Sequence, residues 1–484
     1  MDTSVVIAGA GPAGLMLAGE LRLAGADVVV LERLTGPTGE SRGIGCTTRT
    51  MEIFDERGLL PRLGEYATGN AGHFGGVPLD IGVLGAHHEA ARTVPQSVTE
   101  QALQAWAIGL GAEIRRGHEF LALDDSGDAV TVTVRGPRGE YELRGDYLVG
   151  CDGGRSRVRK AAGFDFPGTE ATTEMLLADI RGVDLQPRMT GQQVGGGFVM
   201  VAKLAGGIHR VIVGERGVPP RRRTESPAYA EVADMWKRLT GIDISHADPV
   251  WVSAFGDATR QVTEYRRGRV LLAGDAAHVH LPAGGQGMNT SLQDAHNLGW
   301  KLAATLRGTA GPELLDTYHT ERHETGRRML ANTRAQSLLV LGGTEAQPLR
   351  DLLAELITYP DVARHLAAKV SGLDIRYDVG DGPHPLLGRR LPHLPLTAGG
   401  RATSSTELLR AGRGVLLDLA DNAVLRRRAH AWRDRVDIVT AVPAGDLPET
   451  TGVLVRPDGH VAWAAPGSHL GVSAALARWF GARR

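Results

Sequence analysis

The chain has 484 residues, more than one hydrophobic core usually organises, so two or three domains are expected. Hydrophobic residues account for 42% and charged residues for 23%, which excludes a disordered chain and indicates a globular one. The formal net charge of −1 excludes an overall attraction to nucleic acid or to anionic membranes, so neither is expected as a partner.

The N-terminal elements predict a dinucleotide-binding unit. An apolar strand, Ser4–Ala8, leads into Gly9-Ala-Gly-Pro-Ala-Gly14, and Leu15–Ala24 continues as a helix. In this context Gly9 permits the tight turn, Gly11 lets the backbone approach a pyrophosphate, and Gly14 lets the helix pack closely on the strand. Pro12 and Ala13 lie in the same turn, where the helix N-terminus presents N–H groups to the phosphates.

A second apolar strand, Asp27–Leu31, ends in Glu32, 18 positions beyond Gly14, where a carboxylate can bond a ribose hydroxyl. The elements that follow alternate between helix and strand. They are a loop with Arg42, the helices Thr48–Arg57 and Thr99–Leu110, a hairpin over Val130–Leu143, and a short strand, Tyr147–Gly150, before Cys151-Asp152-Gly153. We assign residues 1–171 to the first part of the dinucleotide-binding domain.

Residues 172–267 change to alternating strands, among them Phe198–Leu204, His209–Glu215 and Pro249–Ser253. This pattern predicts an inserted antiparallel sheet. Beside a dinucleotide-binding domain, such a sheet would cover a large apolar ligand and form a substrate domain.

The segment 270–289 predicts a second contact with the same cofactor. Val270–Ala273 is a strand that delivers Asp275 at its C-terminal end, where the carboxylate would hold a ribityl chain. Pro282 stiffens the following loop, and Gly285 and Gly287 let the backbone lie against a flat ring. Met288 and Asn289 begin a helix whose N–H groups would stabilise negative charge on the pyrimidine end of a flavin. Together with Gly9–Gly14, these residues predict FAD.

His278 and His280 lie two positions apart without a carboxylate or third histidine at useful spacing, so they are interpreted as packing or polar residues and no metal is expected. Long helices follow at Thr290–Leu306 and Leu314–Val340, and we assign residues 268–380 to the second part of the FAD-binding domain.

Glycine and proline gather near Tyr377–Pro395 and mark a boundary, so residues 381–484 are expected to form a separate domain. Its order of strand, helix, strand and a closing strand pair resembles a thioredoxin-like fold. It has no Cys-x-x-Cys, which excludes thiol exchange and favours a structural or oligomeric role. The only cysteines, Cys46 and Cys151, and the lack of a signal peptide or long apolar run indicate a cytoplasmic protein.

At this point the chain resembles the group A flavoprotein monooxygenases, which are FAD-dependent aromatic hydroxylases with a p-hydroxybenzoate hydroxylase-like fold. The motifs that carry the resemblance are Gly9–Gly14, Cys151-Asp152-Gly153, Gly274-Asp275 and Leu281-Pro-Ala-Gly-Gly-Gln-Gly-Met-Asn289. It implies that Asp152 and Gly153 serve FAD and a reduced nicotinamide, and that NADPH binds transiently as co-substrate. By the same analogy Arg33, Arg42 and Gln96 contact FAD, and Arg49 lies near the flavin ring as a catalytic residue.

Within that family the chain is similar to hydroxylases of aromatic polyketide pathways, above all those that act on angucyclines. The segments Gly39–Gly43, Gly72–Gly76, Arg260–Arg266 and Arg456–Trp463 carry this similarity. It implies hydroxylation of an angucyclinone such as prejadomycin, from ring-B phenol to quinone, by O₂ through a flavin C4a-hydroperoxide, in antibiotic biosynthesis. A homodimer is compatible with the appended domain.

Several alternatives stay open from the sequence. His73 and His209 are candidates for a general base by chemistry alone, while an ionised phenol needs no dedicated base. A Baeyer–Villiger or ring-cleaving oxygenase, or an enzyme that inactivates tetracycline or rifamycin, would use the same scaffold. A flavoprotein that binds a polyketide without oxidising it is the non-catalytic alternative.

Overall fold

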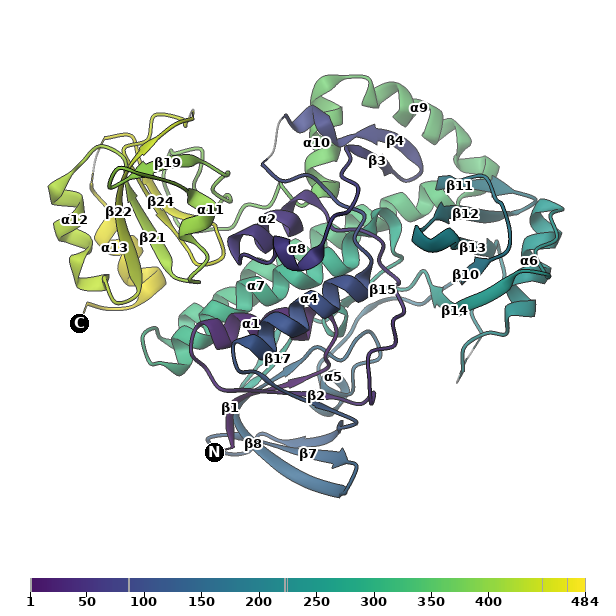
Figure 1. Ribbon diagram of the computed structural model, residues 1–484, viewed down its shortest axis with the longest axis horizontal. Coiled ribbons are helices and arrows are strands. Elements are labelled where there is room, and N and C mark those ends of the chain that lie inside the picture. Colours follow the sequence, from purple (N-terminus) through teal and green to yellow (C-terminus); the bar gives the residue numbers. More distant parts are fainter. Residues whose placement is uncertain are drawn as a thin grey trace.

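The computed structural model describes residues 2–85, 88–221, 223, 225–445, 447–467 and 469–483. Figure 1 shows a central body of sheet and long helices, a separate sheet region in teal, and a C-terminal domain in yellow and green at the opposite side. The three parts correspond to the Rossmann-like domain, the inserted antiparallel sheet and the thioredoxin-like domain expected from the sequence. Among the described helices, none has the length and apolarity that crossing a membrane requires.

The body is built on a sheet in the order β16-β17-β8-β1-β2-β5, whose strands are parallel except β16. Their bounds are β1 (Thr3–Ala8), β2 (Val28–Glu32), β5 (Glu113–Arg116), β8 (Gly139–Gly150), β16 (Arg266–Arg267) and β17 (Val270–Leu272). The antiparallel strands β6 (Glu119–Asp124) and β7 (Val130–Gly136) continue the sheet from β8. The expected strand Tyr147–Gly150 is the end of the longer β8, because its first half pairs with β7.

Helices pack on this sheet and help to bury its apolar strands. They are α1 (Pro12–Leu23), α4 (Gln96–Gly109) and α7 (Gln286–Leu306), and the body also contains the shorter α2 (Thr48–Glu56), α3 (Leu60–Leu63) and α5 (Arg157–Ala161). Helix α1 packs against both α4 and α7. Gly14 allows α1 to start close to β1, since a methyl carbon there would lie 2.0 Å from the carbonyl oxygen of Gly9.

The inserted region is a five-stranded antiparallel sheet in the order β11-β12-β13-β10-β14. The strands are β10 (Glu174–Arg181), β11 (Arg188–Val194), β12 (Gly197–Lys203), β13 (His209–Glu215) and β14 (Asp248–Gly256), and α6 (Tyr229–Thr240) packs on one face. We call strands β10 to β14 with α6 the sheet domain. A small sheet of β9 (Gly168–Thr169), β15 (Thr259–Gln261) and β18 (His278–Val279) joins it to the body.

Beyond α7, the long α8 (Pro312–Leu341) runs between the body and the sheet domain (Figure 1). It is followed by α9 (Gln347–Ile357) and α10 (Pro360–Ser371). These helices pack on a hairpin of β3 (Ala71–Phe74) and β4 (Val77–Asp80) through Phe74, Leu79 and Leu339, ahead of the short turn η1 (Ile81–Leu84). The hairpin therefore lies beside the body although it comes early in the chain.

The C-terminal domain has the strand order β20-β19-β22-β21-β23-β24, in which β21 and β22 are parallel and β23 and β24 antiparallel. Its elements are β19 (Pro395–Ala398), β20 (Arg401–Ser404), α11 (Ser405–Leu408), β21 (Gly414–Asp418), α12 (Ala423–Ala429), β22 (Val436–Pro443), β23 (Gly452–Val455), β24 (Val461–Ala465) and α13 (Val472–Phe480). The strand pair around the turn Pro457–Gly459 closes the sheet as predicted.

That turn carries a buried ionic contact with the body. Arg456 donates to both carboxylate oxygens of Glu321 at 2.6 and 2.8 Å and to Asp458. Arg57 donates to Glu20 and to the carbonyl of Pro457 at 2.8 Å. Because all these side chains are almost fully buried, the domain is held by charges that have no access to water.

Candidate functional site

The residues predicted to bind a dinucleotide gather at the C-terminal ends of β1, β2, β8 and β17, where open parallel sheets bind ligands. Gly9 has a φ of +105°, and a methyl carbon there would lie 2.4 Å from the carbonyl oxygen of Cys151. At Gly11, by contrast, a methyl carbon would meet no atom within 4 Å. The backbone of Gly11, Pro12 and Ala13 at the start of α1 is therefore open to a pyrophosphate.

Glu32 lies at the end of β2 and holds the turn that follows β1. One carboxylate oxygen accepts the amide of Ala10 at 2.9 Å and the other the amide of Leu34 at 2.9 Å. Each oxygen keeps a further lone pair for a ribose hydroxyl. Arg33, the next residue, is exposed.

Glu100 was missed by the sequence interpretation and lies close to this corner. Burial and the nearby Glu32 raise the pKa of its carboxyl group. Gln96, which donates a hydrogen bond to it at 2.8 Å, and Arg116 lower that pKa, but the net shift is upwards.

Asp152 precedes α5 and binds the N-terminal end of that helix, whose N-cap residue is Ser156. It accepts the hydroxyl of Ser156 at 2.5 Å and the amides of Arg157 and Val158 at 2.6 and 3.1 Å. Gly153 follows with a φ of +79° and open space where a side chain would stand. The cap explains Asp152 without a ligand, so the cofactor role of Asp152 and Gly153 stays a prediction.

Asp275 is exposed at the end of β17, and a buried group fixes the backbone before it. Asp294 of α7 accepts the amide of Gly274 at 3.0 Å, His278 Nε2 at 2.8 Å and Arg322 Nε at 2.6 Å. Burial would raise the pKa of Asp294, but Arg322 and His278 bring it below its usual value. His278 is thus polar packing as expected, and its carboxylate partner, 16 residues away, escaped the sequence interpretation.

The loop before α7 combines an unusual backbone with a fixed helix start. Gly284 and Gly285 have φ values of +70° and +65°, a region that favours glycine, and Pro282 precedes them. Helix α7 begins at Gln286, two residues earlier than predicted, so Gly287, Met288 and Asn289 lie in its first turn, where the N–H groups lack helical partners.

Asn289 ties this helix to the loop before α2. Its Oδ1 accepts the amide of Thr47 at 2.9 Å, and its Nδ2 donates to the carbonyls of Gly285 at 2.8 Å and Gly45 at 3.3 Å. Gln96 holds the same loop through a pair of bonds with Gly43, at 3.2 and 3.0 Å. Asn289 and Gln96 therefore shape the site whether or not they also touch the cofactor.

Arg42 lies where this loop meets the sheet domain, and its guanidinium donates to Ser253 Oγ at 3.4 Å. The loop is held there by Arg210 of β13, which donates to the carbonyls of Ser41 and of Arg42, the latter at 2.9 Å. Asp179 of β10 accepts two bonds from Arg210 at 2.7 and 2.8 Å. The sequence interpretation missed Arg210 and Asp179, because only the strand register places them opposite one another.

The face of the sheet domain turned away from α6 is apolar beside this pair. Met175 and Phe198 pack there against Leu281, with Met200, Ile212 and Phe255 partly buried around them. Ala283 joins the same cluster. An apolar wall thus lies directly beside the loop Pro282–Gly287.

His209 and His73, the two candidates for a general base, face different parts of the molecule. His209 points to the α6 side together with Val211 and Val213, and neither of its ring nitrogens has a hydrogen-bond partner among the described residues. The position of His209 in a strand was predicted. Because it lies on the α6 face, away from the apolar wall, it cannot act as a general base on a substrate there. His73 lies on β3, which packs on the turn η4 (Ala283–Gly285), and it faces away from Phe74 and α10.

The Arg49 guanidinium is buried, and both of its terminal nitrogens form hydrogen bonds. It donates to Glu56 Oε1 at 2.7 Å and to the carbonyl of Asp458 in the C-terminal domain at 3.1 Å. These contacts account for Arg49 as an interdomain residue. A place beside a flavin ring stays a prediction.

Taken together, the open backbone at Gly11, the exposed carboxylate of Asp275 and the start of α7, which has no side-chain cap among the described residues, fit FAD. The apolar wall packed beside that loop suits an aromatic ligand.

Comparisons with known proteins agree with this assignment. Residues 2–333 match a model described as FAD binding domain, and residues 384–482 match one described as aromatic-ring hydroxylase, C-terminal. The chain is 44% identical to the 12-dehydrotetracycline 5-monooxygenase/anhydrotetracycline 6-monooxygenase of Streptomyces rimosus, over 99% of each chain.

Several solved structures, two of them with especially high identity, cover the whole of both chains. One is BexE, in a study of oxidation during BE-7585A biosynthesis, with 68% identity and a TM-score of 0.97. The other is CabE, an aromatic hydroxylase from angucycline biosynthesis, with 62% identity and a TM-score of 0.97.

Proposed function

The chain belongs to the FAD-dependent aromatic-ring hydroxylases, and from this we propose that it hydroxylates an angucyclinone such as prejadomycin, taking the ring-B phenol to a quinone with NADPH and O₂. The family and its relatives make it a monooxygenase of aromatic polyketides in antibiotic biosynthesis. The apolar wall beside the loop Pro282–Gly287 carries the proposal of a large flat substrate. The similarity to CabE supports the angucycline class.

In this proposal the chain's own residues hold the cofactor from two ends. Gly9–Gly14 receive the pyrophosphate, Glu32 bonds the adenosine ribose, and Asp275 bonds the ribityl chain. The first turn of α7 stabilises the negative charge that reduction places on the ring. When bound, FAD would supply the redox chemistry by which NADPH and O₂ add one oxygen atom to the phenol ring and release water, and a second O₂ would oxidise the resulting hydroquinone to the quinone. The wall of Met175, Phe198 and their neighbours excludes water from that transfer.

His73 is proposed to orient the substrate by donating a hydrogen bond. Its Nδ1 accepts the amide of Gly76 at 3.3 Å, so the neutral ring carries its proton on Nε2. Burial lowers the pKa of His73, which keeps the ring neutral near pH 7. The tautomer favours a donor to a phenolate oxygen over the general base expected from the sequence.

Replacing His73 separates these roles. His73→Gln keeps an N–H donor and is expected to retain most of kcat, whereas His73→Leu should lower kcat by about 10- to 100-fold, the scale of one charge-assisted hydrogen bond. Steady-state NADPH oxidation with product quantified would measure both. Equal losses in the two variants would contradict the donor role.

Arg210 is proposed as a positioning residue for the loop Ser41–Gly43. In Arg210→Met the loop loses two donors and Asp179 loses its partner, so both the thermal midpoint and the yield of product per NADPH should fall. In Arg210→Met with Asp179→Leu the unpaired charge is gone and stability should recover. Hydrogen peroxide release should stay high in the double variant, because the loop is still untethered. Recovery of both readouts would reduce Arg210 to a purely structural residue.

The proposed reaction is tested by NADPH oxidation by the FAD-loaded protein, with and without prejadomycin, with the mass and spectrum of the product. Strong stimulation, a gain of oxygen and a carbocyclic quinone are the expected results. A lactone would indicate Baeyer–Villiger chemistry instead. No stimulation by any polycyclic phenol would overturn the proposal and favour a different substrate or a binding role.

A further inference from the structure

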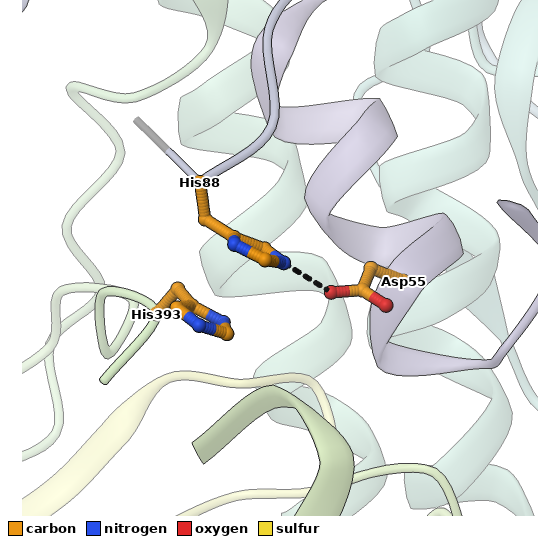
Figure 2. Close-up of side chains that lie close together, drawn as sticks. All are labelled: Asp55, His88 and His393. Atoms are coloured by element: carbon orange, nitrogen blue, oxygen red, sulfur yellow. Dashed lines mark hydrogen bonds and ion pairs between the residues drawn. The ribbon is translucent and has the colours of Figure 1, made fainter. Parts of the chain in front are cut away.

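Two histidines and an aspartate converge where the C-terminal domain meets the body, away from the site described above. Figure 2 shows Asp55 on α2, His88 after η1, and His393 just before β19. One ligand atom from each lies within 4.8 Å of the others. The sequence interpretation missed this cluster because its members come from three distant segments. We propose that Asp55, His88 and His393 bind Zn²⁺ and so link the C-terminal domain to α2.

The donor set suits this ion. Zn²⁺ binds imidazole nitrogen and carboxylate oxygen, and it usually has four ligands in a tetrahedron. A water molecule would therefore be the fourth ligand beside these three residues. Ligand atoms about 2.0–2.1 Å from one ion lie roughly 3.3 Å apart. His88 Nε2 and Asp55 Oδ2 are 3.1 Å apart, close to that spacing.

His393 is oriented for the same ion. Its Nδ1 bonds the Thr406 hydroxyl at 2.8 Å, which fixes the ring in the way that outer-shell partners fix metal-binding histidines. The other ring nitrogen has no hydrogen-bond partner among the described residues and is free to bind a metal.

The two imidazoles lie face to face, with ring centroids 3.4 Å apart and planes 5° from parallel (Figure 2). Binding one ion would therefore require the rings to splay. His88 is exposed and comes from a loop, so it can move with little loss of packing.

Arg410 is the one competitor for Asp55 among the described residues besides His88, with its guanidinium 3.5 Å from Oδ1. Its side chain is 49% exposed and also lies 3.7 Å from Glu407, so it can leave Asp55 when a cation arrives. This contact gives a diagnostic variant. Arg410→Ala should tighten zinc binding, because the ion no longer displaces a positive charge.

Calorimetric titration of Zn²⁺ into FAD-loaded protein, stripped of metal with a chelator, tests the proposal. One ion per chain is expected. Binding should weaken by about tenfold or more in His88→Gln and His393→Gln, and should be unchanged in His365→Gln, an exposed histidine on α10. Zinc should raise the thermal midpoint of the wild type but not of His393→Gln.

Retained FAD content and circular dichroism would establish that the variants fold. Absence of stoichiometric zinc binding in the wild type, or equal binding in the wild type and both ligand variants, would overturn the proposal. These readouts do not depend on which substrate the enzyme oxidises.

Discussion

The variant Asp275→Ala is expected to purify folded but nearly free of FAD. Its carboxylate is exposed and interacts electrostatically with His280, but it forms no hydrogen bond or ion pair with another described residue, so its removal should change stability little. A hydrogen bond to a charged group contributes about 1.5–3 kcal/mol, so FAD binding should weaken by about 10- to 100-fold. The flavin absorbance per chain and a titration of the apoprotein with FAD would measure the loss.

Two further variants sharpen this prediction. Asp275→Asn keeps one oxygen acceptor and should bind FAD with intermediate affinity. Asp361→Ala removes an exposed aspartate on α10 and should bind FAD like the wild type. If Asp275→Ala purified yellow with full activity, its carboxylate would have no part in holding the cofactor.

The variant Arg456→Met is expected to lose the most stability. The change leaves Glu321 and Asp458 buried without their main partner, with side chains 4% and 1% exposed. Breaking a buried pair in this way costs about 3–5 kcal/mol. Denaturant unfolding followed by tryptophan fluorescence should report it, since Arg456 lies over the rings of Trp300 and Trp479.

Two matched variants show how much of the stability loss is due to the burial of the pair and how much to the unpaired charge. Arg364→Met breaks an exposed pair and should change the free energy of unfolding by less than about 0.5 kcal/mol. Adding Asp458→Asn to Arg456→Met removes one unpaired charge and should restore part of the loss. Wild-type stability in Arg456→Met would mean that the network does not hold the domain in place.

Low pH should weaken the same contact between Arg456 and Glu321. Burial raises the pKa of Glu321, but Arg456 and Lys301 lower it from 4.5 to about 2. The stability that Glu321 contributes is therefore fully present above pH 4.5 and is lost as the pH falls towards 2. In Arg456→Met the folded-state pKa should rise, so this acid-dependent loss should begin at a higher pH.

The strands, turns and helix starts of the candidate FAD site could be predicted because their signals are local. Gly9, Gly11 and Asp275 are defined by a turn, a strand end and a helix start, each visible within a few residues of the chain. The alternation of β12, β13 and β14 likewise follows from a periodicity of two. Such features depend on backbone geometry that the neighbouring residues dictate.

Other roles depended on partners far away in the chain. His209 and His73 are both strand histidines, and only the packing of α6 and of the turn η4 distinguishes a buried core side from the side facing the site. Arg49 resembled a residue beside the flavin, yet its guanidinium meets the carbonyl of Asp458, 409 positions later.

The sequence by itself therefore determined the fold class and the hydroxylase family. Only the tertiary structure decided which charges are buried together, such as Arg210 with Asp179, and which side chains from separate segments converge, such as Asp55, His88 and His393. The physical reason is that strand, turn and helix preferences act over a few residues, whereas ion pairs and donor clusters depend on distances set by packing of the whole chain.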